Sequence, residues 1–207
     1  MSISVIVASY GDREFWEPMS RIAVSSAAKQ VPRPEIIRIH GNTLAEARNL
    51  GASLSSGDWL CFLDCDDVLE PGYLYAMEES IESIGVPNAL FYPLLRRVPR
   101  IDAASSEYQA VDLTKDKLWR GNYMVIGTII NSHVFHAVGG FHELPAYEDW
   151  DLWLRCVYRA GCTPIKVSGA VYRALIRQDG RNLIPNAFEL TKRILAKNGF
   201  IIRDAAR

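Results

Sequence analysis

Hydrophobic and polar positions in the first part of the chain follow two periods in alternation. Short apolar runs are followed by longer stretches in which apolar residues recur every three or four positions. The short runs are typical of strands covered on both faces of a sheet, and the longer stretches are typical of helices. We therefore predict strands at residues 3–8, 35–40, 59–63 and 89–95, with helices at 14–30, 43–55 and 71–84.

Strands that alternate with helices in this order predict an α/β protein with a mainly parallel sheet. Asn42 or Thr43 would cap the second helix, and Pro71 is well placed to begin the third. Because ligands of such sheets bind beyond the carboxyl ends of the strands, side chains at those ends are the candidates for chemistry.

The rest of the chain has shorter and less regular elements. Residues 96–120 are polar and irregular, which is typical of a loop beside a site, and we expect this segment to be mobile. Beyond it we predict strands near 125–130, 164–168 and 170–176, with helices near 132–138, at about 147–159 and from Pro185 onward.

Composition and charge narrow the class of protein. The 207 residues are 49% hydrophobic and 23% charged, which fits one globular domain. Lys and Arg (23) nearly balance Asp and Glu (24), so nothing in the whole-molecule charge favours a nucleic-acid or membrane binder. The charge is unevenly divided, with −9 over residues 1–151 and +8 over residues 152–207. An acidic first part could hold a metal and a basic last part could hold phosphates, although solvated helix faces would explain the same bias.

The cysteines and the N-terminus predict a cytoplasmic protein. None of the four cysteines is part of a CxxC pair, and no basic segment with an apolar run opens the chain. Residues 121–142 contain no Asp, Glu, Lys or Arg, but Asn, Ser, His and Gly interrupt them, so we predict no transmembrane segment.

Three carboxylates follow the strand predicted at 59–63. Asp64, Asp66 and Asp67 would repel one another at a strand end, and a divalent cation with oxygen ligands would offset that repulsion. The alternative is an Asp-rich turn that caps the helix near Pro71.

A second acidic pair, Glu148 and Asp149, begins the helix predicted at 147–159. Carboxylates there also suit the helix dipole, so capping alone would explain them. A preceding glycine pair, flanking aromatic residues and the need for a base in any transfer to a hydroxyl group favour a catalytic role.

Three blocks of sequence, in order, resemble the family 2 glycosyltransferases of the GT-A fold. These blocks are ISVIVASYGDR, AEARNLGASLSSGDWLCFLDCDDVLEPGYL, and VGGFHE with AYEDWDLWLRCVYRAG, and they extend from residue 3 to about residue 173. The resemblance implies a Rossmann-like, mostly parallel central sheet flanked by helices in a single compact domain, residues 1–207. Residues 1–95 would bind the nucleotide sugar and metal, and residues 121–207 would supply the acceptor side, the catalytic base and a basic C-terminal helix.

The resemblance also implies which residues bind the nucleotide. The first strand and the loop after it, together with the RN-G block, would contact the nucleotide. In this chain those positions are Ala8, Ser9, Tyr10, Arg13, Arg48 and Asn49. From the charge of the C-terminal part, three arginines could in addition close over the diphosphate, namely Arg173, Arg177 and Arg181.

The resemblance assigns the acidic residues as well. Asp66 would be the direct ligand of Mg or Mn, with Asp64 nearer the ribose and Asp67 assisting. Asp149, next to Glu148, would be the base that deprotonates the acceptor. The activity implied is a metal-dependent, inverting transfer of one sugar from a nucleotide-diphosphate sugar, with UDP as the expected nucleotide, to a hydroxyl acceptor.

The chain departs from the family pattern at three places. Residues 39–43 lack the family's Asp-Asp-Gly-Ser, so the nucleotide base stays open. No His follows Tyr172 and Arg173, so the third metal ligand is unassigned. Residues 178–182 are QDGRN instead of the QxxRW of processive synthases, which favours transfer of a single sugar.

Other functions stay open at this point. Residues 64–69 also match the DxDx[TV] motif of haloacid-dehalogenase-type phosphohydrolases, although that motif normally follows the first strand. A sugar nucleotidyltransferase would need a glycine-rich loop with lysine, which residues 10–13 lack. A non-catalytic module that binds a nucleotide or glycan is the third alternative.

The acceptor is undetermined and could be a saccharide, a lipid-linked glycan, a protein or a modified nucleic acid. The final helix carries Lys192, Arg193 and Lys197 beside apolar residues. That pattern fits peripheral contact with an anionic membrane surface, an anionic acceptor, or a solvated helix face.

Overall fold

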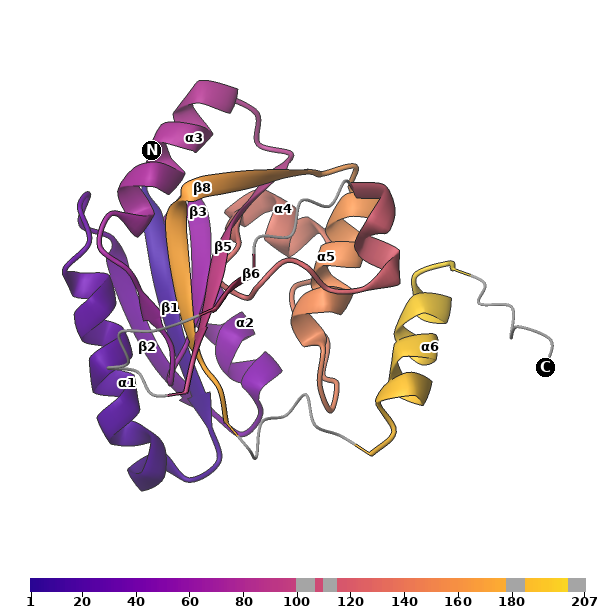
Figure 1. Cartoon of the computed structure of the whole chain (residues 1–207), viewed down its shortest axis with the longest axis horizontal. Coiled ribbons are helices and arrows are strands. Elements are labelled where there is room, and N and C mark those ends of the chain that lie inside the picture. The colour runs from indigo at the N-terminus through magenta and orange to yellow at the C-terminus, as the bar shows by residue number, and fades with distance from the viewer. Residues whose placement is uncertain (100–106, 110–114, 178–184, 201–207) are drawn as a thin grey trace.

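An eight-stranded mixed sheet forms the centre of the computed structural model, which describes residues 1–99, 107–109, 115–177 and 185–200 (Figure 1). The strand order is β2-β1-β3-β7-β5-β8-β4, and β6 pairs with β5 outside this path. The strands are β1 (Ile3–Tyr10), β2 (Glu35–Gly41), β3 (Trp59–Asp64), β4 (Val68–Leu69), β5 (Ala89–Val98), β6 (Glu107–Gln109), β7 (Ile129–Asn131) and β8 (Thr163–Leu175).

Long parallel ladders dominate the sheet. β1 is parallel to both β2 and β3, and β5 is parallel to β8 over most of its length. The antiparallel pairs are short and involve β4, β6 or β7. The prediction of a mostly parallel α/β sheet is therefore confirmed, with β7 as an antiparallel strand inserted between β3 and β5.

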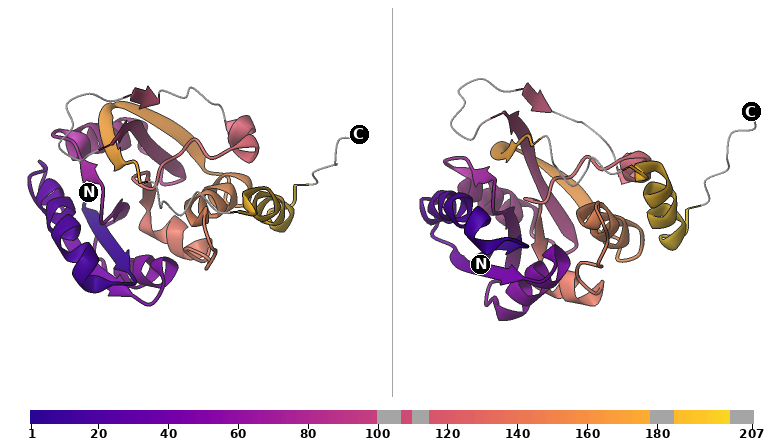
Figure 2. Two further views of the ribbon diagram at one scale, coloured as in Figure 1. Left: turned by 60° about the horizontal axis from the view of Figure 1, so that its bottom comes forward. Right: turned by 90° about the horizontal axis from the view of Figure 1, so that it is seen from below.

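Helices cover the sheet on both faces, and further helices lie beyond it at one side. α1 and α2 pack on β1 and β2, and α3 packs on β5 and β8. α6 lies beyond α5, at the side of the molecule away from α1, in Figure 1 and in both views of Figure 2. The helices are α1 (Arg13–Ala28), α2 (Leu44–Leu54), α3 (Tyr73–Ile84), α4 (Ser132–Ala137), α5 (Glu148–Tyr158) and α6 (Ala187–Lys197), with the 3-10 helix η1 (Lys115–Arg120).

Local sequence explains where the first helices begin. The Asp12 carboxylate accepts hydrogen bonds from the backbone N–H groups of Glu14 and Phe15, which are otherwise unpaired at the start of α1. Thr43 caps α2 by accepting from the Glu46 N–H, so Thr43 is the cap of the two candidates. α3 begins two residues after Pro71, because Gly72 precedes it at a left-handed φ of 83°.

The C-terminal strands differ from the sequence prediction. The two short strands expected near 164–168 and 170–176 are one strand, β8, because β5 pairs with it on both sides of an irregularity between Pro93 and Leu94. β4 was not predicted, because two residues are too few for a recognisable pattern.

Part of the segment expected to be a mobile loop, residues 96–120, is regular structure. β5 continues to Val98 because β8 provides a partner as far as Leu175, and β6 and η1 follow. Residues 100–106 and 110–114 lie outside the described part of the chain.

Among the described residues, no helix has the length and apolar character needed to cross a bilayer.

The packing of α2 on β1 leaves no room for a side chain at Gly51. A Cβ atom there would lie 2.4 Å from the Ile6 Cγ2 atom. We expect Gly51→Ala to lower the free energy of unfolding by about 1–3 kcal/mol, because a buried interface has to move apart. Ser53→Ala, at an exposed position of the same helix, is the matched control and should change stability little. Urea unfolding of both variants measures the difference, and equal stabilities would contradict the packing described.

Candidate active site

A small cavity of about 90 Å³ lies at the carboxyl ends of β1 and β2. The Ser9 hydroxyl is 3.0 Å from the His40 Nδ1 atom across these two strands. Ser9 and Arg13, both predicted to bind the nucleotide, line this cavity, while Ala8 pairs with Asp64 of β3 and Tyr10 with Gly41. The other lining residues were not identified from the sequence because they lie on several elements; they are Trp16, Glu17, Arg38, Ile39 and His40.

The three aspartates after β3 occupy different environments. The Asp64 side chain is 30% exposed and Asp66 is half-buried, so both carboxylates reach the surface of the site. Asp67 is buried, and its two oxygens accept hydrogen bonds from the Tyr172 hydroxyl (2.8 Å) and the Leu175 N–H (2.9 Å). Burial, and then the neighbouring Asp66 and Asp64, hold the pKa of Asp67 well above its usual range. The Asp67 carboxyl group thus attaches the turn to β8, and its expected part in holding a metal stays a prediction.

A divalent cation fits the remaining donors. In the described part of the chain, no three or more His, Cys, Asp and Glu side chains are grouped as a metal site. Asp64 and Asp66 nevertheless provide the carboxylate oxygens that Mg²⁺ and Mn²⁺ favour, and such ions commonly complete their coordination with water and substrate phosphates.

Arg48 lies between the two acidic groups. The residue is 3% exposed, and its guanidinium donates to Asp64 at 2.6 Å and lies 5.0 Å from the centre of the Phe141 ring. Burial alone would lower the pKa of Arg48, but the charges of Asp64, Glu148 and Asp149 raise it above its ordinary value. Arg48 therefore joins the end of β3 to the start of α5 electrostatically.

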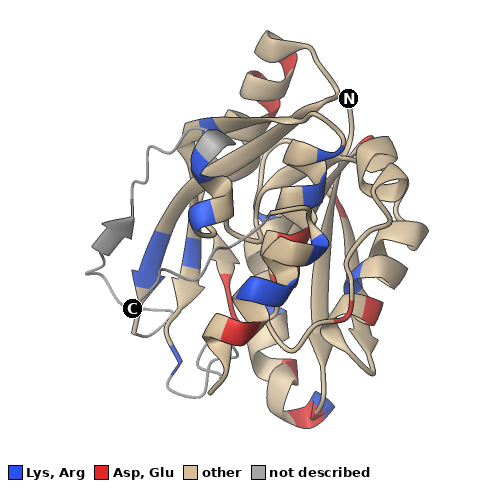
Figure 3. Ribbon diagram, turned by 90° about the vertical axis from the view of Figure 1, so that its right-hand side faces the viewer, with Lys and Arg blue, Asp and Glu red and all other residues tan. Residues whose placement is uncertain are grey.

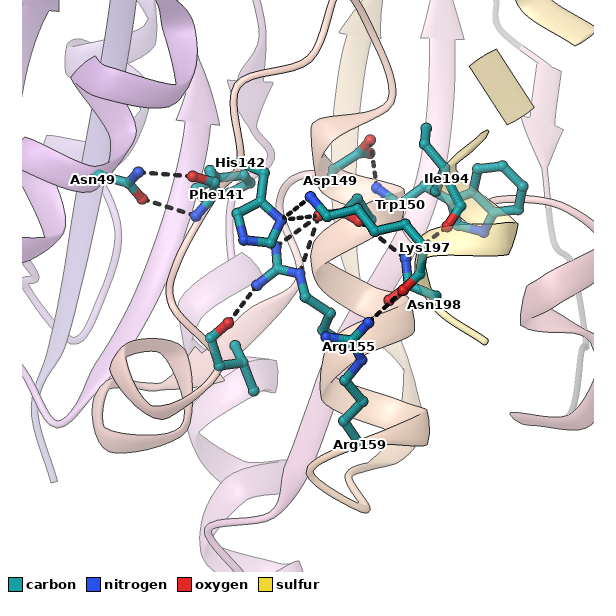
Figure 4. Close-up of polar contacts among 12 residues, drawn as sticks. Asn49, Phe141, His142, Asp149, Trp150, Arg155, Arg159, Ile194, Lys197 and Asn198 are labelled. Carbon is teal, nitrogen blue, oxygen red and sulfur yellow. Dashed lines mark hydrogen bonds and ion pairs between the residues drawn. The ribbon is translucent and has the colours of Figure 1, made fainter. Parts of the chain in front are cut away.

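Asn49 holds the loop that leads to α5. Its side-chain amide donates to the Phe141 carbonyl and accepts from the Phe141 N–H, both at 2.8 Å (Figure 4). Gly140, with a φ of 63°, allows this approach, because a Cβ atom there would lie 2.5 Å from the Asn49 Oδ1 atom. Both polar ends of the Asn49 side chain are thus engaged by Phe141, and its predicted role at the nucleotide stays a prediction.

Asp149 is held at the start of α5 by two hydrogen bonds. Its Oδ2 atom accepts from the Asn122 amide at 2.8 Å. Its Oδ1 atom accepts from the Trp150 N–H at 2.8 Å (Figure 4). Burial raises the pKa of Asp149 to about 6, partly opposed by the positive charge of Arg48 and reinforced by the negative charge of Glu148. Glu148 itself is buried. A carboxylate with this pKa is ionised at neutral pH and can still accept a proton.

Asp151 anchors α5 from inside the protein. It is fully buried, and its Oδ2 atom lies 3.0 Å from the Arg155 Nε atom and 2.8 Å from the His142 Nδ1 atom. Its Oδ1 atom accepts from the Asn198 amide, which connects α5 to the end of α6. Arg155 donates in turn to the Val138 carbonyl at 2.6 Å. The ion pair between Asp151 and Arg155 is the one expected from their spacing of four on a helix.

A second and larger cavity, of about 470 Å³, is bordered by Asp149, and the rest of its wall is formed by β5, β8 and the segment from η1 to Val125. The rings of Tyr92 and Tyr123 meet edge-on inside this wall, with their centres 5.5 Å apart. Asp149 thus has its backbone in α5 and its carboxyl group at the border of an accessible space.

The two described C-terminal arginines contact different parts of the protein. Arg173 binds Glu70, with nitrogen to oxygen distances of 2.9 and 2.7 Å. The Arg177 Cζ atom lies 5.3 Å from the centre of the Phe15 ring and 5.0 Å from that of Trp16. Because Trp16 lines the small cavity, Arg177 lies beside that cavity. Arg181 lies outside the described residues.

The two aspartates of α5 should affect stability in opposite directions. Between about pH 4 and pH 6 the folded protein keeps Asp149 protonated while the unfolded chain ionises it, so the free energy of unfolding falls as pH rises through this range. Asp149→Asn should remove this loss and raise stability at pH 7.5 by about 1–2 kcal/mol. Asp151→Asn should lower it by about 3–5 kcal/mol, because Arg155 would be left buried without its partner. Thermal and urea unfolding at pH 5 and 7.5 measure both changes; the same sign for both variants would refute the assignment.

Comparison with known proteins agrees with this architecture. A family model described as Glycosyl transferase family 2 matches residues 17–92. An uncharacterized glycosyltransferase of Haemophilus influenzae is 28% identical over 131 residues, which cover 60% of this chain and 44% of that protein. The uncharacterized glycosyltransferase YwdF of Bacillus subtilis is 25% identical over 201 residues, covering 79% of this chain and 72% of that protein. The chain thus spans less than half the length of the Haemophilus influenzae relative.

Two solved structures have a similar fold. Residues 1–349 of TarS from S. aureus, in complex with UDP-GlcNAc, superpose with a TM-score of 0.70 at 15% identity, over 95% of this chain and 66% of that one. GalNAc-T7 with UDP, GalNAc and Mn²⁺ superposes with a TM-score of 0.66 at 13% identity, over 95% of this chain and 48% of that one. The chain is thus similar in sequence to the family 2 glycosyltransferases over residues 17–92, which the family model matches, and it has the GT-A fold.

Proposed function

We propose that this protein transfers one sugar from a nucleotide-diphosphate sugar to a hydroxyl group of an acceptor, with metal dependence and inversion at the anomeric carbon. The observation that carries the proposal is the position of Arg48, buried beside Asp64 and within electrostatic reach of Asp149. Asp64, which is suited to bind a metal, and Asp149, which is suited to accept a proton, therefore interact with the same buried cation, Arg48.

The donor would bind on the side of β1, β2 and β3. The cavity lined by Ser9, Arg13 and His40 lies at the carboxyl ends of the first two strands, next to the strand that carries Asp64. A divalent cation held by Asp64 and Asp66 would neutralise the charge that develops on the departing diphosphate. The UDP-GlcNAc complex of TarS and the UDP and Mn²⁺ complex of GalNAc-T7 support UDP as the nucleotide and Mn²⁺ as one suitable ion.

The acceptor would be activated by Asp149. In a single displacement, the acceptor oxygen forms a bond to the anomeric carbon while the bond from that carbon to the diphosphate oxygen breaks. The acceptor proton passes to the Asp149 carboxylate, and the departing diphosphate keeps the electron pair of the broken bond. Asn122 orients the Asp149 carboxylate, and Arg48 favours its ionised form, so both act as positioning residues for the base.

The phosphohydrolase alternative has less support. Its motif would make Asp64 the nucleophile after the first strand of the sheet, whereas here Asp64 ends β3 and is paired with Arg48. A nucleotide-binding or glycan-binding module without turnover is distinguished from the proposal by the Asp149 variant below.

Asp149→Asn keeps the size of the side chain but removes the proton acceptor. We expect transfer to fall by about a hundredfold or more while UDP binding with Mn²⁺ is retained. In the unmodified protein, kcat/KM should rise with pH to a plateau above an apparent pKa near 6, the value of Asp149. Glu143→Gln, at an exposed position near α5, is the matched control. The assay measures release of UDP from a nucleotide sugar with acceptor present, and full activity of Asp149→Asn would eliminate this mechanism.

Asp66→Asn tests the metal side separately. The unmodified protein should bind UDP more tightly with Mn²⁺ than in EDTA, because without the metal the carboxylates of Asp64 and Asp66 repel the diphosphate. Asp66→Asn should lose most of this difference, and Glu79→Gln, on the exposed face of α3, should keep it. Titration calorimetry gives the affinities. Equal binding of UDP in Mn²⁺ and EDTA by the unmodified protein would exclude a metal bridge.

A further inference from the structure

Basic side chains surround the larger cavity beside Asp149. Its wall contains Arg97 of β5, Lys166 of β8, and Lys117 and Arg120 of η1, whereas Asp149 is its one lining carboxylate among the described side chains. These cations come from three elements that are far apart in the sequence. Figure 3, which faces the side of the molecule that carries α6, shows Lys and Arg in blue on both helices and strands.

Lys117 and Arg120 are the cations on which the argument depends. Both side chains are exposed, and no ion pair links either one to a carboxylate of the described residues. Arg120 also lies 5.1 Å from the centre of the Trp119 ring. Arg97 lies opposite Glu107 in the backbone register of β5 and β6.

The other surfaces of the cavity are apolar or aromatic. Tyr92, Pro93, Leu94 and Met124 line it, together with the ring of Tyr123. Aromatic faces suit the flat apolar face of a sugar or polyol, and cavities of about 300–1,000 Å³ hold compounds of that size. A compound bound there would have the Asp149 carboxylate at its border and cations around the rest of its polar groups.

The charged residues that line this cavity differ from those that line the smaller cavity on the donor side. The smaller cavity at β1 and β2 is lined by Arg13 and Arg38 together with Glu17, and Arg38 is paired with Glu17. In the larger cavity the cations exceed the carboxylates, so an anion would relieve their mutual repulsion. The diphosphate of the donor is expected near Asp64 and Asp66, which leaves these cations for the other substrate.

We infer that the larger cavity is the acceptor subsite and that it selects a hydroxyl compound carrying a phosphate or carboxylate, which Lys117 and Arg120 bind while its hydroxyl group faces Asp149. This inference rests on the proposed function for the identity of Asp149 as the base. It goes further by naming the chemical class of the acceptor and the residues that select it.

Binding of simple probes tests the inference without requiring turnover. Glucose 6-phosphate and glucuronic acid carry the two anionic groups, and glucose is the neutral comparison. With UDP and Mn²⁺ present, we expect at least one anionic probe to bind about tenfold more tightly than glucose, and its affinity to fall with added salt. Equal binding of all three probes would overturn the inference.

Charge variants locate the anion. The double variant Lys117→Gln with Arg120→Gln should lose about tenfold or more in affinity for the anionic probe and keep its affinity for UDP with Mn²⁺. Lys29→Gln with Arg33→Gln removes the same charge from exposed positions elsewhere and should change neither affinity. Circular dichroism verifies folding of both. A loss of UDP affinity in the first double variant, or an equal loss of probe affinity in the second, would overturn the inference.

Asp149→Asn tests separately whether the anionic probe binds in the larger cavity. Removing a negative charge from the border of the cavity should tighten binding of the anionic probe severalfold and leave glucose unaffected. Unchanged binding of the anionic probe would place the anion elsewhere and overturn the inference. Because these measurements are of binding, transfer that survives Asp149→Asn would refute the proposed function while leaving the selection of an anion by Lys117 and Arg120 intact.

Discussion

A single buried guanidinium balances the negative charges that approach one another at the centre of the site. Arg48 pairs with Asp64 and attracts Glu148 and Asp149, which belong to a strand end and a helix start more than eighty residues apart. Buried carboxylates without a cation would either repel or protonate. The separation of Asp64 and Asp149 therefore depends on where α2 holds Arg48, and α2 in turn depends on its close packing against β1.

The position of Asp149 is set mainly by residues that would not touch a substrate. Asn49 holds the backbone of Phe141, and Asp151 holds Arg155, His142 and Asn198 from inside the protein. This buried network compensates for the cost of keeping Asp149 partly desolvated. Such an arrangement is typical of enzymes, in which stabilising contacts next to the site support a group in the site that is itself destabilising.

The sequence was most informative where a pattern is local. Apolar runs located β1, β2 and β3 within two residues of their observed ends, and capping chemistry located the start of α2. The carboxylates at the end of β3 and at the start of α5 were found because they are grouped closely in the sequence. Contacts between distant segments had no local signal. The inward orientation of Asp67 requires Tyr172, the pinning role of Asn49 requires Phe141, and the basic cavity combines β5, η1 and β8.

The insertion of β7 between β3 and β5 bears on how the chain folds. β3 and β5 both lie within the first 98 residues, yet they do not pair with each other; β7, from residues 129–131, joins them. Until those residues arrive, the sheet has two unpaired inner edges, and closing it requires contacts over long stretches of chain, which slows folding. During synthesis on the ribosome the first half would therefore wait with exposed strand edges, a state in which chaperone binding and aggregation compete. β3, which carries Asp64, and β5, which borders the larger cavity, become parts of one sheet only when β7 is added.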